Sequence, residues 1–391
     1  MQTEFKISYV DGASVEVIGY DENQYDIKFY DNLTDELIHQ SKIGCGYWTK
    51  TGRKYFTEWR VEIYLNDELI KTDLFNCKGK IVRIVLDSTA LGDKIAWVPY
   101  CEEFRKKHDC ELVVTCSAHE FFKDFYPNIK WFPFGMDFHN LYASYRISVG
   151  IDNKLFDESS KILRESTKSN RPINYIPKLS FFNKDLHPVH PISIPLQRVS
   201  SNVLGIEWSE IRPNFDINVS EERPIKEKYI CISEFASAKG MKSWNNPIGW
   251  KTLVSELKNM GYKVISISKE KTELKNIDSR NGDYPLSDRM WYLKHCEFFI
   301  GLSSGLSWLA WAMQKQVVMI GGYTEDWNEF IEDNIRVKKH DACSGCFNSE
   351  KHRDKLVCFH WEWCPEDKNF ECSRKISPKM VMNKIRENNL I

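Results

Sequence analysis

The sequence has no strong excess of positive or negative charge. It also has no long uninterrupted run of apolar residues. Its 54 lysines and arginines balance 55 aspartates and glutamates, and the formal net charge is −1. Nonspecific nucleic-acid binding needs a basic surface, so this balance argues against a nucleic-acid partner. The longest apolar stretch, residues 301–322, contains serines and Lys315. It predicts a helix followed by a strand and argues against a membrane span.

The first twenty residues also lack the basic start and apolar core of a secretory signal. The chain nevertheless has 12 cysteines, and five of them lie between residues 343 and 372. Without a secretory signal we expect these thiols to stay reduced, which predicts a cytoplasmic protein. Five cysteines in so short a segment indicate metal binding instead of core packing.

Hydrophobic periodicity divides the chain into four parts. Period-two alternation predicts an N-terminal β-rich domain in residues 1–76. Strands that alternate with helices predict parallel α/β sheets in residues 77–225, which end in a proline-rich linker, and in residues 226–340. Residues 341–391 hold the cysteines and a last helix. Two α/β parts joined by a linker predict facing Rossmann-like domains with a ligand cleft between them.

The turn Gly-Leu-Ser-Ser-Gly at residues 301–305 follows a predicted strand and opens a predicted helix. Backbone N–H groups at a helix start attract anions, so the turn predicts a diphosphate site, with hydroxyls from Ser303, Ser304 and Ser307. Gly305 would allow the ligand to approach closely. A serine-capped helix without a ligand is the alternative, because any α/β protein can contain one.

Lys239 and Lys242 lie in the loop after the first strand of the second α/β part. A lysine at the carboxyl end of a strand can neutralise phosphate charge on a leaving group, although most loop lysines are only solvated. The nearby Trp244 predicts either core packing or a sugar contact.

Asp93 lies where the first βα turn, in residues 81–97, enters its helix. A carboxylate there can accept a proton from an attacking hydroxyl. It can also cap the helix that we expect to start at Lys94, and the residue pattern alone favours the cap. Asp87, at the end of the strand, is a weaker candidate for the base.

The cysteine cluster predicts a metal site. Cys343 and Cys346 have the spacing of a metal knuckle, and four thiolates in a tetrahedral array suit zinc or iron. The preferred ligand set is Cys343, Cys346, Cys364 and Cys372, with Cys358 as a substitute. His352 and His360 are less favoured ligands. A site closed by four thiolates has no open position, so we predict a structural role.

Five segments together resemble the bacterial autotransporter heptosyltransferases, which O-glycosylate adhesin passenger domains. They are residues 88–108, 195–215, 242–270, 298–313 and 343–381. More distantly, the turns around Gly92 and Gly305 are similar to those of lipopolysaccharide heptosyltransferases.

The resemblance implies a GT-B fold and transfer of heptose from ADP-heptose to serines of an autotransporter passenger protein, without a metal in the reaction. It also implies a cysteine-bound structural iron, for which zinc is the alternative, in a finger-like element, and a large cytoplasmic homo-oligomer. The family's catalytic base falls on Asp93, its donor lysine on Lys242 and its donor turn on Gly301 to Trp308. The loop before Lys242 differs from the family's, so Lys239 stays a second candidate.

Two other functions stay open at this point. One is a heptosyltransferase that acts on lipopolysaccharide or another glycan. The other is a metal-binding scaffold without catalysis, which the complete nucleotide cleft argues against.

Overall fold

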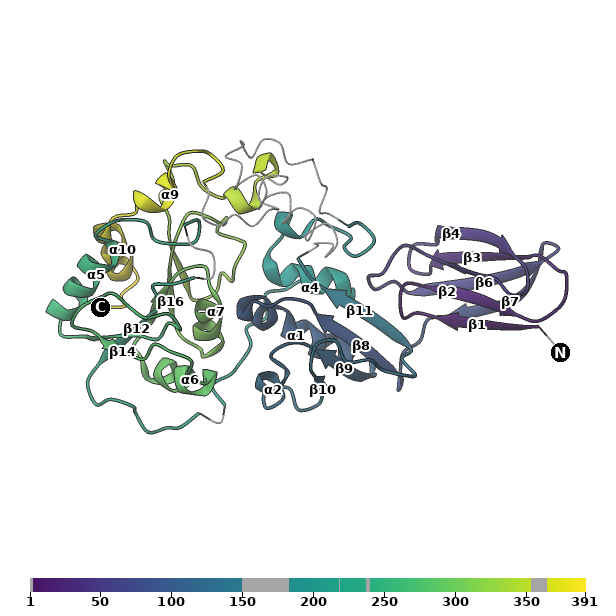
Figure 1. Cartoon of the computed structure of the whole chain (residues 1–391), viewed down its shortest axis with the longest axis horizontal. Coiled ribbons are helices and arrows are strands. Elements are labelled where there is room, and N and C mark those ends of the chain that lie inside the picture. The colour runs from purple at the N-terminus through teal and green to yellow at the C-terminus, as the bar shows by residue number, and fades with distance from the viewer. Residues whose placement is uncertain (1–2, 150–182, 218, 237–239, 353–363) are drawn as a thin grey trace, which may run out of the picture.

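A computed structural model describes residues 3–149, 183–217, 219–236, 240–352 and 364–391. The described parts form an elongated molecule (Figure 1). N-terminal strands occupy one end, a first parallel α/β sheet the middle and a second parallel α/β sheet the other end. Lys239, Cys358 and His360 lie outside the described residues.

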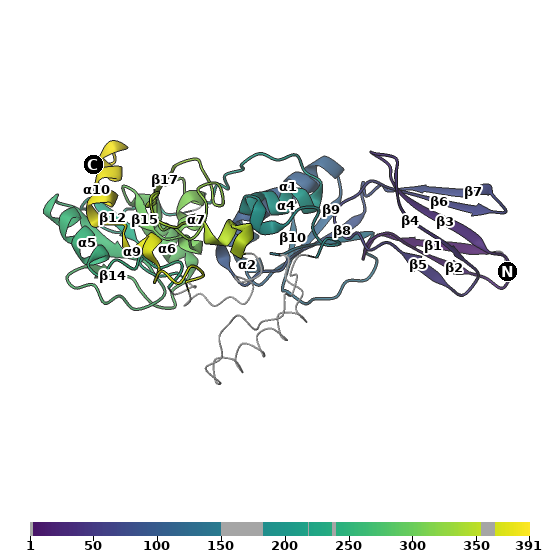
Figure 2. The same ribbon diagram turned by 90° about the horizontal axis from the view of Figure 1, so that it is seen from above.

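The N-terminal strands form two antiparallel sheets, which Figure 2 shows as two layers. One sheet has the order β1-β2-β5, from Glu4–Ser8, Ser14–Ile18 and Trp48–Lys50. The other has the order β4-β3-β6-β7, from Glu36–Ile43, Tyr25–Asp31, Trp59–Leu65 and Glu68–Leu74. Alternate apolar side chains are fully buried, among them Val15, Ile27 and Val61. Period-two alternation places these side chains on one face of each sheet, and they are buried because the other sheet covers that face.

The first α/β sheet is parallel and has the strand order β10-β9-β8-β11. In that order the strands are Lys130–Phe132, Glu111–Thr115, Ile81–Leu86 and Ala143–Ile147. Its helices are α1 (Leu91–His108), α2 (His119–Phe122) and α4 (Leu196–Leu204). Every second residue of β8 is fully buried, while Arg83 and Val85 on the other face are half-buried. The indole Nε1 of Trp97 on α1 donates to the carbonyl of Leu196, which joins α1 to α4.

The second α/β sheet is also parallel, with the order β14-β13-β12-β15-β16-β17. In that order the strands are Asp278–Ser279, Lys263–Ser266, Tyr229–Ile232, Phe299–Gly301, Val317–Ile320 and Asn334–Val337. The longer helices of this unit are α5 (Gly249–Asn259), α6 (Leu286–His295), α7 (Gly305–Ala312) and α10 (Pro378–Glu387). Short helical turns lie at Pro191–Ser193, Cys346–Asn348, Glu350–His352 and Glu371–Arg374.

The last helix, α10, packs into the core of the second α/β unit. Its buried Val381, Met382 and Ile385 share a hydrophobic cluster with Leu253 and Leu257 of α5. The sequence grouped this helix with the cysteines in residues 341–391. The structure instead makes it a layer of the preceding sheet, because its apolar stripe needs a partner to cover it.

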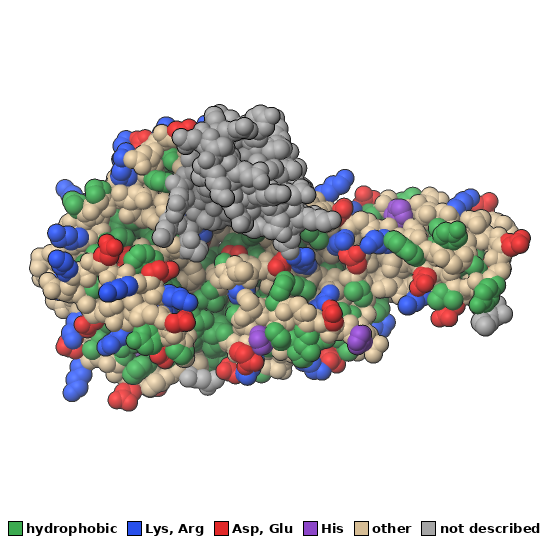
Figure 3. Space-filling view, viewed as in Figure 1, with side chains coloured by type: hydrophobic (Ala, Val, Ile, Leu, Met, Phe, Trp, Pro, Cys, Tyr) green, Lys and Arg blue, Asp and Glu red, His purple; other side chains and the backbone are tan. Residues whose placement is uncertain are grey.

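On the face shown in Figure 3, basic and acidic side chains are interspersed along the whole length of the molecule, which agrees with the balanced composition. Across the described residues, no helix is both long and apolar enough to cross a membrane.

Candidate active site at the junction of the two sheets

The turns that begin α1 and α7 meet between the two α/β units. A Cβ atom added to Gly92 would lie 2.9 Å from Cδ1 of Trp308 and 3.4 Å from Cα of Gly305. A Cβ atom added to Gly305 would lie 3.0 Å from Cβ of Leu91. These glycines are therefore needed for the close approach of the two helices. Two helix N-termini, each with partial positive charge, converge here.

Asp93 lies in the first turn of α1, at the carboxyl end of β8. The N-cap of α1 is Ala90 and the helix begins at Leu91, so the capping role for Asp93 is wrong. Its half-buried carboxylate instead accepts a hydrogen bond from Ser88, with 2.6 Å between Oγ and Oδ2. The catalytic and the capping hypotheses both placed the carboxylate at this turn. The position of the N-cap at Ala90 rules out the capping hypothesis.

The electrostatic surroundings of Asp93 suit a proton acceptor. Burial raises the pKa of this carboxyl above its ordinary value, against the lowering effects of the Ser88 hydrogen bond and the charges of Lys242 and Lys94. A raised carboxyl pKa brings a group closer to the working pH of a general base.

Lys242 approaches Asp93 from the other α/β unit. It lies between β12 and α5, and its Nζ is 5.8 Å from the centre of the Tyr323 ring. Its charge acts on the Asp93 carboxylate. The fold thus brings together two predicted site residues that lie about 150 positions apart in the sequence.

The three serine hydroxyls at the start of α7 have different surroundings. Ser303 Oγ donates to Oε1 of Glu329 at 2.5 Å. Ser304 is the N-cap of α7, and its buried Oγ has no hydrogen-bond partner within the described part of the chain. The fully buried Ser307 donates to the carbonyl of Leu302 at 2.5 Å and so braces the turn. A buried hydroxyl without a partner at a helix start is a place where a ligand atom completes the hydrogen bonding.

The two tryptophans of the predicted donor site are packed in the core. Trp244 is 4% exposed, and its Nε1 donates to the carbonyl of Ile376 at 2.9 Å. Trp308 is 3% exposed and lies edge-on to Phe330, with ring centroids 4.9 Å apart. Both rings are buried, which for Trp244 favours the packing interpretation.

A buried carboxylate that the sequence did not point to supports the serine turn. Glu329 is 3% exposed and accepts hydrogen bonds from Ser303, Thr324 and Arg336. The Arg336 Nη1 to Glu329 Oε2 distance is 2.9 Å. These residues come together only because β15, β16 and β17 pair, so no local sequence pattern predicts that Glu329 supports the serine turn.

Known proteins resemble this chain in sequence and in fold. Residues 190–356 match the model of glycosyltransferase family 9 (heptosyltransferase). The autotransporter heptosyltransferase Aah of Escherichia coli is 31% identical over 402 residues, which cover 97% of this chain and 92% of Aah. The chain belongs to the autotransporter heptosyltransferases. It is therefore a member of a glycosyltransferase family.

The fold is shared with a solved member of this family, TibC of enterotoxigenic E. coli H10407. TibC, solved as a dodecameric, iron-containing heptosyltransferase in complex with ADP-D-β-D-heptose, matches with a TM-score of 0.81 and 25% identity. The match covers 99% of this chain and 96% of that chain. The likeness confirms the prediction of a GT-B fold built on parallel sheets.

The family also contains a protein named as inactive. This relative, BimC of Burkholderia thailandensis, is 26% identical over 93% of this chain and 82% of its own length. Membership in the family therefore does not by itself show that a protein is catalytically active. The argument for catalysis rests on the residues of the site.

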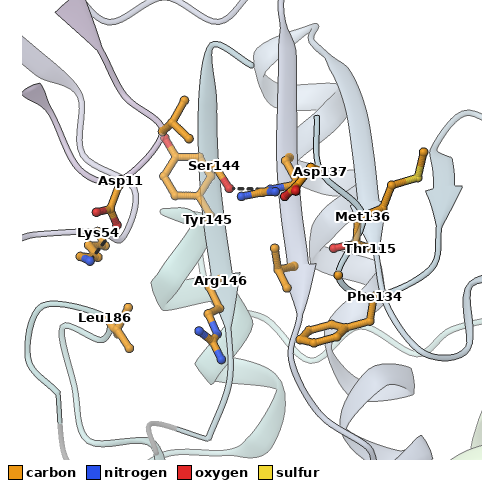
Figure 4. Close-up of a pocket in the computed structure, with 14 residues that line it drawn as sticks. Asp11, Lys54, Thr115, Phe134, Met136, Asp137, Ser144, Tyr145, Arg146 and Leu186 are labelled. Carbon is orange, nitrogen blue, oxygen red and sulfur yellow. Dashed lines mark hydrogen bonds and ion pairs between the residues drawn. The ribbon is translucent and has the colours of Figure 1, made fainter. Parts of the chain in front are cut away.

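Asp87, the weaker candidate for the base in this heptosyltransferase, is held elsewhere. It forms an ion pair with Arg146, which lines a cavity of about 310 Å³ between the first sheet and the N-terminal strands (Figure 4). In the same cavity Arg83 Nε donates to Ser144 Oγ at 3.0 Å. The described lining residues include neither Asp93 nor Lys242, so this cavity is separate from the junction.

The four preferred cysteine ligands lie close enough to influence one another. Burial, followed by the negative charge of neighbouring thiols, raises the pKa of Cys346 to about 12. The same causes raise the pKa of Cys372 to about 11. These shared effects show that the four cysteine side chains lie near one another, and a bound cation would favour their ionised forms.

The described cysteine side chains do not converge on a common metal position in this structure. Within the described ranges, no group of three or more histidine, cysteine, aspartate or glutamate side chains is arranged to hold a metal ion. The ring of His352 contacts Glu366 and is buried.

Proposed function

We propose that this protein transfers heptose from ADP-heptose to serine hydroxyls of an autotransporter adhesin passenger domain. The observation that carries the proposal is the contact of the Asp93 turn with the start of α7, where Gly92 meets Gly305, together with the charge of Lys242 from the second unit acting on Asp93. The membership of the chain in the autotransporter heptosyltransferases supports the donor and the acceptor class.

The donor diphosphate would bind at the N-terminus of α7. The backbone N–H groups of the first turn of α7, the hydroxyl of Ser304 and the ammonium of Lys242 would together provide hydrogen bonds and positive charge for the leaving ADP. Ser303 and Ser307 would act indirectly, because their hydroxyls hold the turn through Glu329 and Leu302. Lys239 remains a predicted second lysine.

Asp93 would act as the general base. Its carboxylate accepts the proton of the acceptor serine while the serine oxygen forms a bond to the anomeric carbon of the heptose. The bond from that carbon to the diphosphate oxygen breaks, and ADP leaves with the bonding electrons. The half-buried position of Asp93 between two helix starts limits competing water at the reacting atoms.

The cysteines would hold a structural iron, with zinc as the alternative. The mutual influence of the thiols of Cys343, Cys346, Cys364 and Cys372 supports this ligand set, as does the iron in TibC. When bound, the metal would tie this segment to the second sheet, because Cys372 packs against Gly322 at the end of β16. Four thiolates leave no coordination position open for a reaction step. Cys358 stays a predicted substitute outside the described residues.

Three further features complete the proposal. The N-terminal sheets would form a domain of their own, and the chain would assemble into a homo-oligomer, as TibC does. The protein would act in the cytoplasm, where its cysteines stay reduced; all the cysteines in the described ranges are free thiols.

Mass spectrometry of an autotransporter passenger, co-expressed with this protein in a host that makes ADP-heptose, tests the proposal. We expect a mass increase of one heptose on serines, lost with Asp93→Asn and retained with Asp87→Asn, the matched carboxylate that pairs with Arg146. Transfer by Asp93→Asn at the wild-type rate would rule out the base. An unmodified passenger together with heptosylated lipopolysaccharide would favour the glycan acceptor instead.

A further inference from the structure

The loop between β8 and α1 carries a chain of hydrogen bonds that ends at Asp93. Ser88 Oγ accepts a hydrogen bond from the backbone N–H of Ala90 at 3.0 Å and lies 2.6 Å from Oδ2 of Asp93. A serine hydroxyl has one proton to donate. Since the Ala90 amide already donates to this oxygen, the orientation of the hydroxyl directs its proton to the aspartate.

Lys94 fixes the backbone of the same loop. It is 2% exposed, and its ammonium donates to the carbonyls of Ser88 and Thr89 at 3.0 and 3.1 Å and to Ser117 Oγ at 3.0 Å. Three acceptors satisfy all three N–H donors of a lysine. Ser117 follows β9, the neighbouring strand, so the lysine ties the loop to the sheet beside it.

We propose that Ser88 is a positioning residue for the reaction, and that Lys94 holds Ser88 in place. The hydrogen bond from Ser88 occupies Oδ2 of Asp93 and stops rotation of the carboxylate, which leaves Oδ1 to accept the proton of the acceptor hydroxyl. An aspartate carboxylate otherwise rotates broadly about its last torsion angle. This inference rests on the proposed function, since it takes Asp93 as the base.

The pH dependence of transfer separates this role from a structural one. Lys242 acts on Asp93 from the loop after β12, and Lys94 lies beside it on α1; a change at Ser88 removes neither charge. A hydrogen bond to the ionised carboxylate favours ionisation. Ser88→Ala should therefore move the acidic limb of the kcat profile up by about one pH unit.

The rate at the plateau should also fall. We expect Ser88→Ala to lower kcat on the order of tenfold, because the base is no longer held in one orientation. KM for ADP-heptose should change by less than about twofold, since the donor subsite at α7 is untouched. Ser88→Thr keeps a hydroxyl and should restore both the rate and the limb, while Ser88→Cys, a weaker donor, should fall between Thr and Ala.

Thr89→Ala is the matched control, because it removes the neighbouring exposed hydroxyl and leaves the carbonyl that Lys94 binds. Its acidic limb should coincide with that of the wild type. Wild-type kcat and pH profile in Ser88→Ala would overturn the positioning role while leaving the proposed function standing. Absence of transfer by the wild type itself would overturn both. If the alanine variant does not fold, the comparison of Ser88→Cys with Ser88→Thr decides the question in the same way.

Discussion

Gly92 and Gly305 face each other at the starts of α1 and α7, and a Cβ atom added to Gly305 would lie 3.2 Å from the backbone nitrogen of Gly92. Neither glycine has a positive φ, so close approach explains both. The contact sets the distance between the unit that carries Asp93 and the unit that carries Lys242.

Gly305→Val should disturb this contact. The added side chain meets Leu91 and the backbone of Gly92, so we expect a loss of stability of about 1–3 kcal/mol, seen as a lower Tm. Transfer should fall by tenfold or more, because helix starts pushed apart move Asp93 away from the donor. Thermal unfolding and initial rates on the same sample test both effects. Unchanged rates in a folded variant would show that the contact does not set the site geometry.

Asp93→Asn should abolish transfer and raise stability at neutral pH. The folded-state pKa of Asp93 is raised, so the folded protein binds this proton more tightly than the unfolded chain does. Stability from this group is complete at low pH and is lost as pH rises through the raised pKa. Asparagine carries no charge to bury, so its Tm advantage over the wild type should be present at pH 7 and shrink toward pH 3. An advantage that grows on acidification would contradict the raised pKa.

Lys242→Met should weaken the donor site. Loss of the ammonium removes positive charge from the diphosphate position, and we expect KM for ADP-heptose to rise about tenfold. The charge of Lys242 also lowers the pKa of Asp93, so the acidic limb of the rate profile should move up. Lys251→Met, on the exposed face of α5, is the control and should match the wild type in both measurements.

Cys343→Ser should release the metal. Elemental analysis of protein purified without added metal should find about one iron or zinc per chain in the wild type and much less in the variant. Cys45→Ser, in the turn between β4 and β5, should keep the metal and serves as the control. Light scattering on the same samples would show whether the oligomer depends on the metal. Full metal content in Cys343→Ser would remove this cysteine from the ligand set.

Local pattern was sufficient to predict two parallel α/β sheets and their central strands. Buried strands such as β8 and β12 read as short apolar runs, and the amphipathic helices after them show their stripe in the sequence. The edge strands β7, β11, β14 and β17 were not predicted, because an edge strand needs no continuous apolar run.

For the candidate site, the sequence predicted the contributing segments better than the individual side chains that face a ligand. Asp93, Lys242 and the turn before α7 were candidates because each follows a strand of a parallel sheet, where ligands bind, and the family resemblance then assigned their roles. Trp244 and Trp308 belonged to the same segments, yet both are buried in the core. A motif identifies the segment, but only the packing of neighbouring elements decides which of its side chains face the ligand.

The sequence by itself determined the alternation of strands and helices, the balance of charge, the family resemblance and the segments that contribute to the site, since these follow from residue order and local periodicity. The tertiary structure alone decided that Ser88 and Lys94 hold the loop of Asp93, that Glu329 braces the serine turn, and that α10 completes the second sheet. These contacts join residues whose local patterns are ordinary, and they arise because burial leaves each polar group and each apolar stripe in need of a partner.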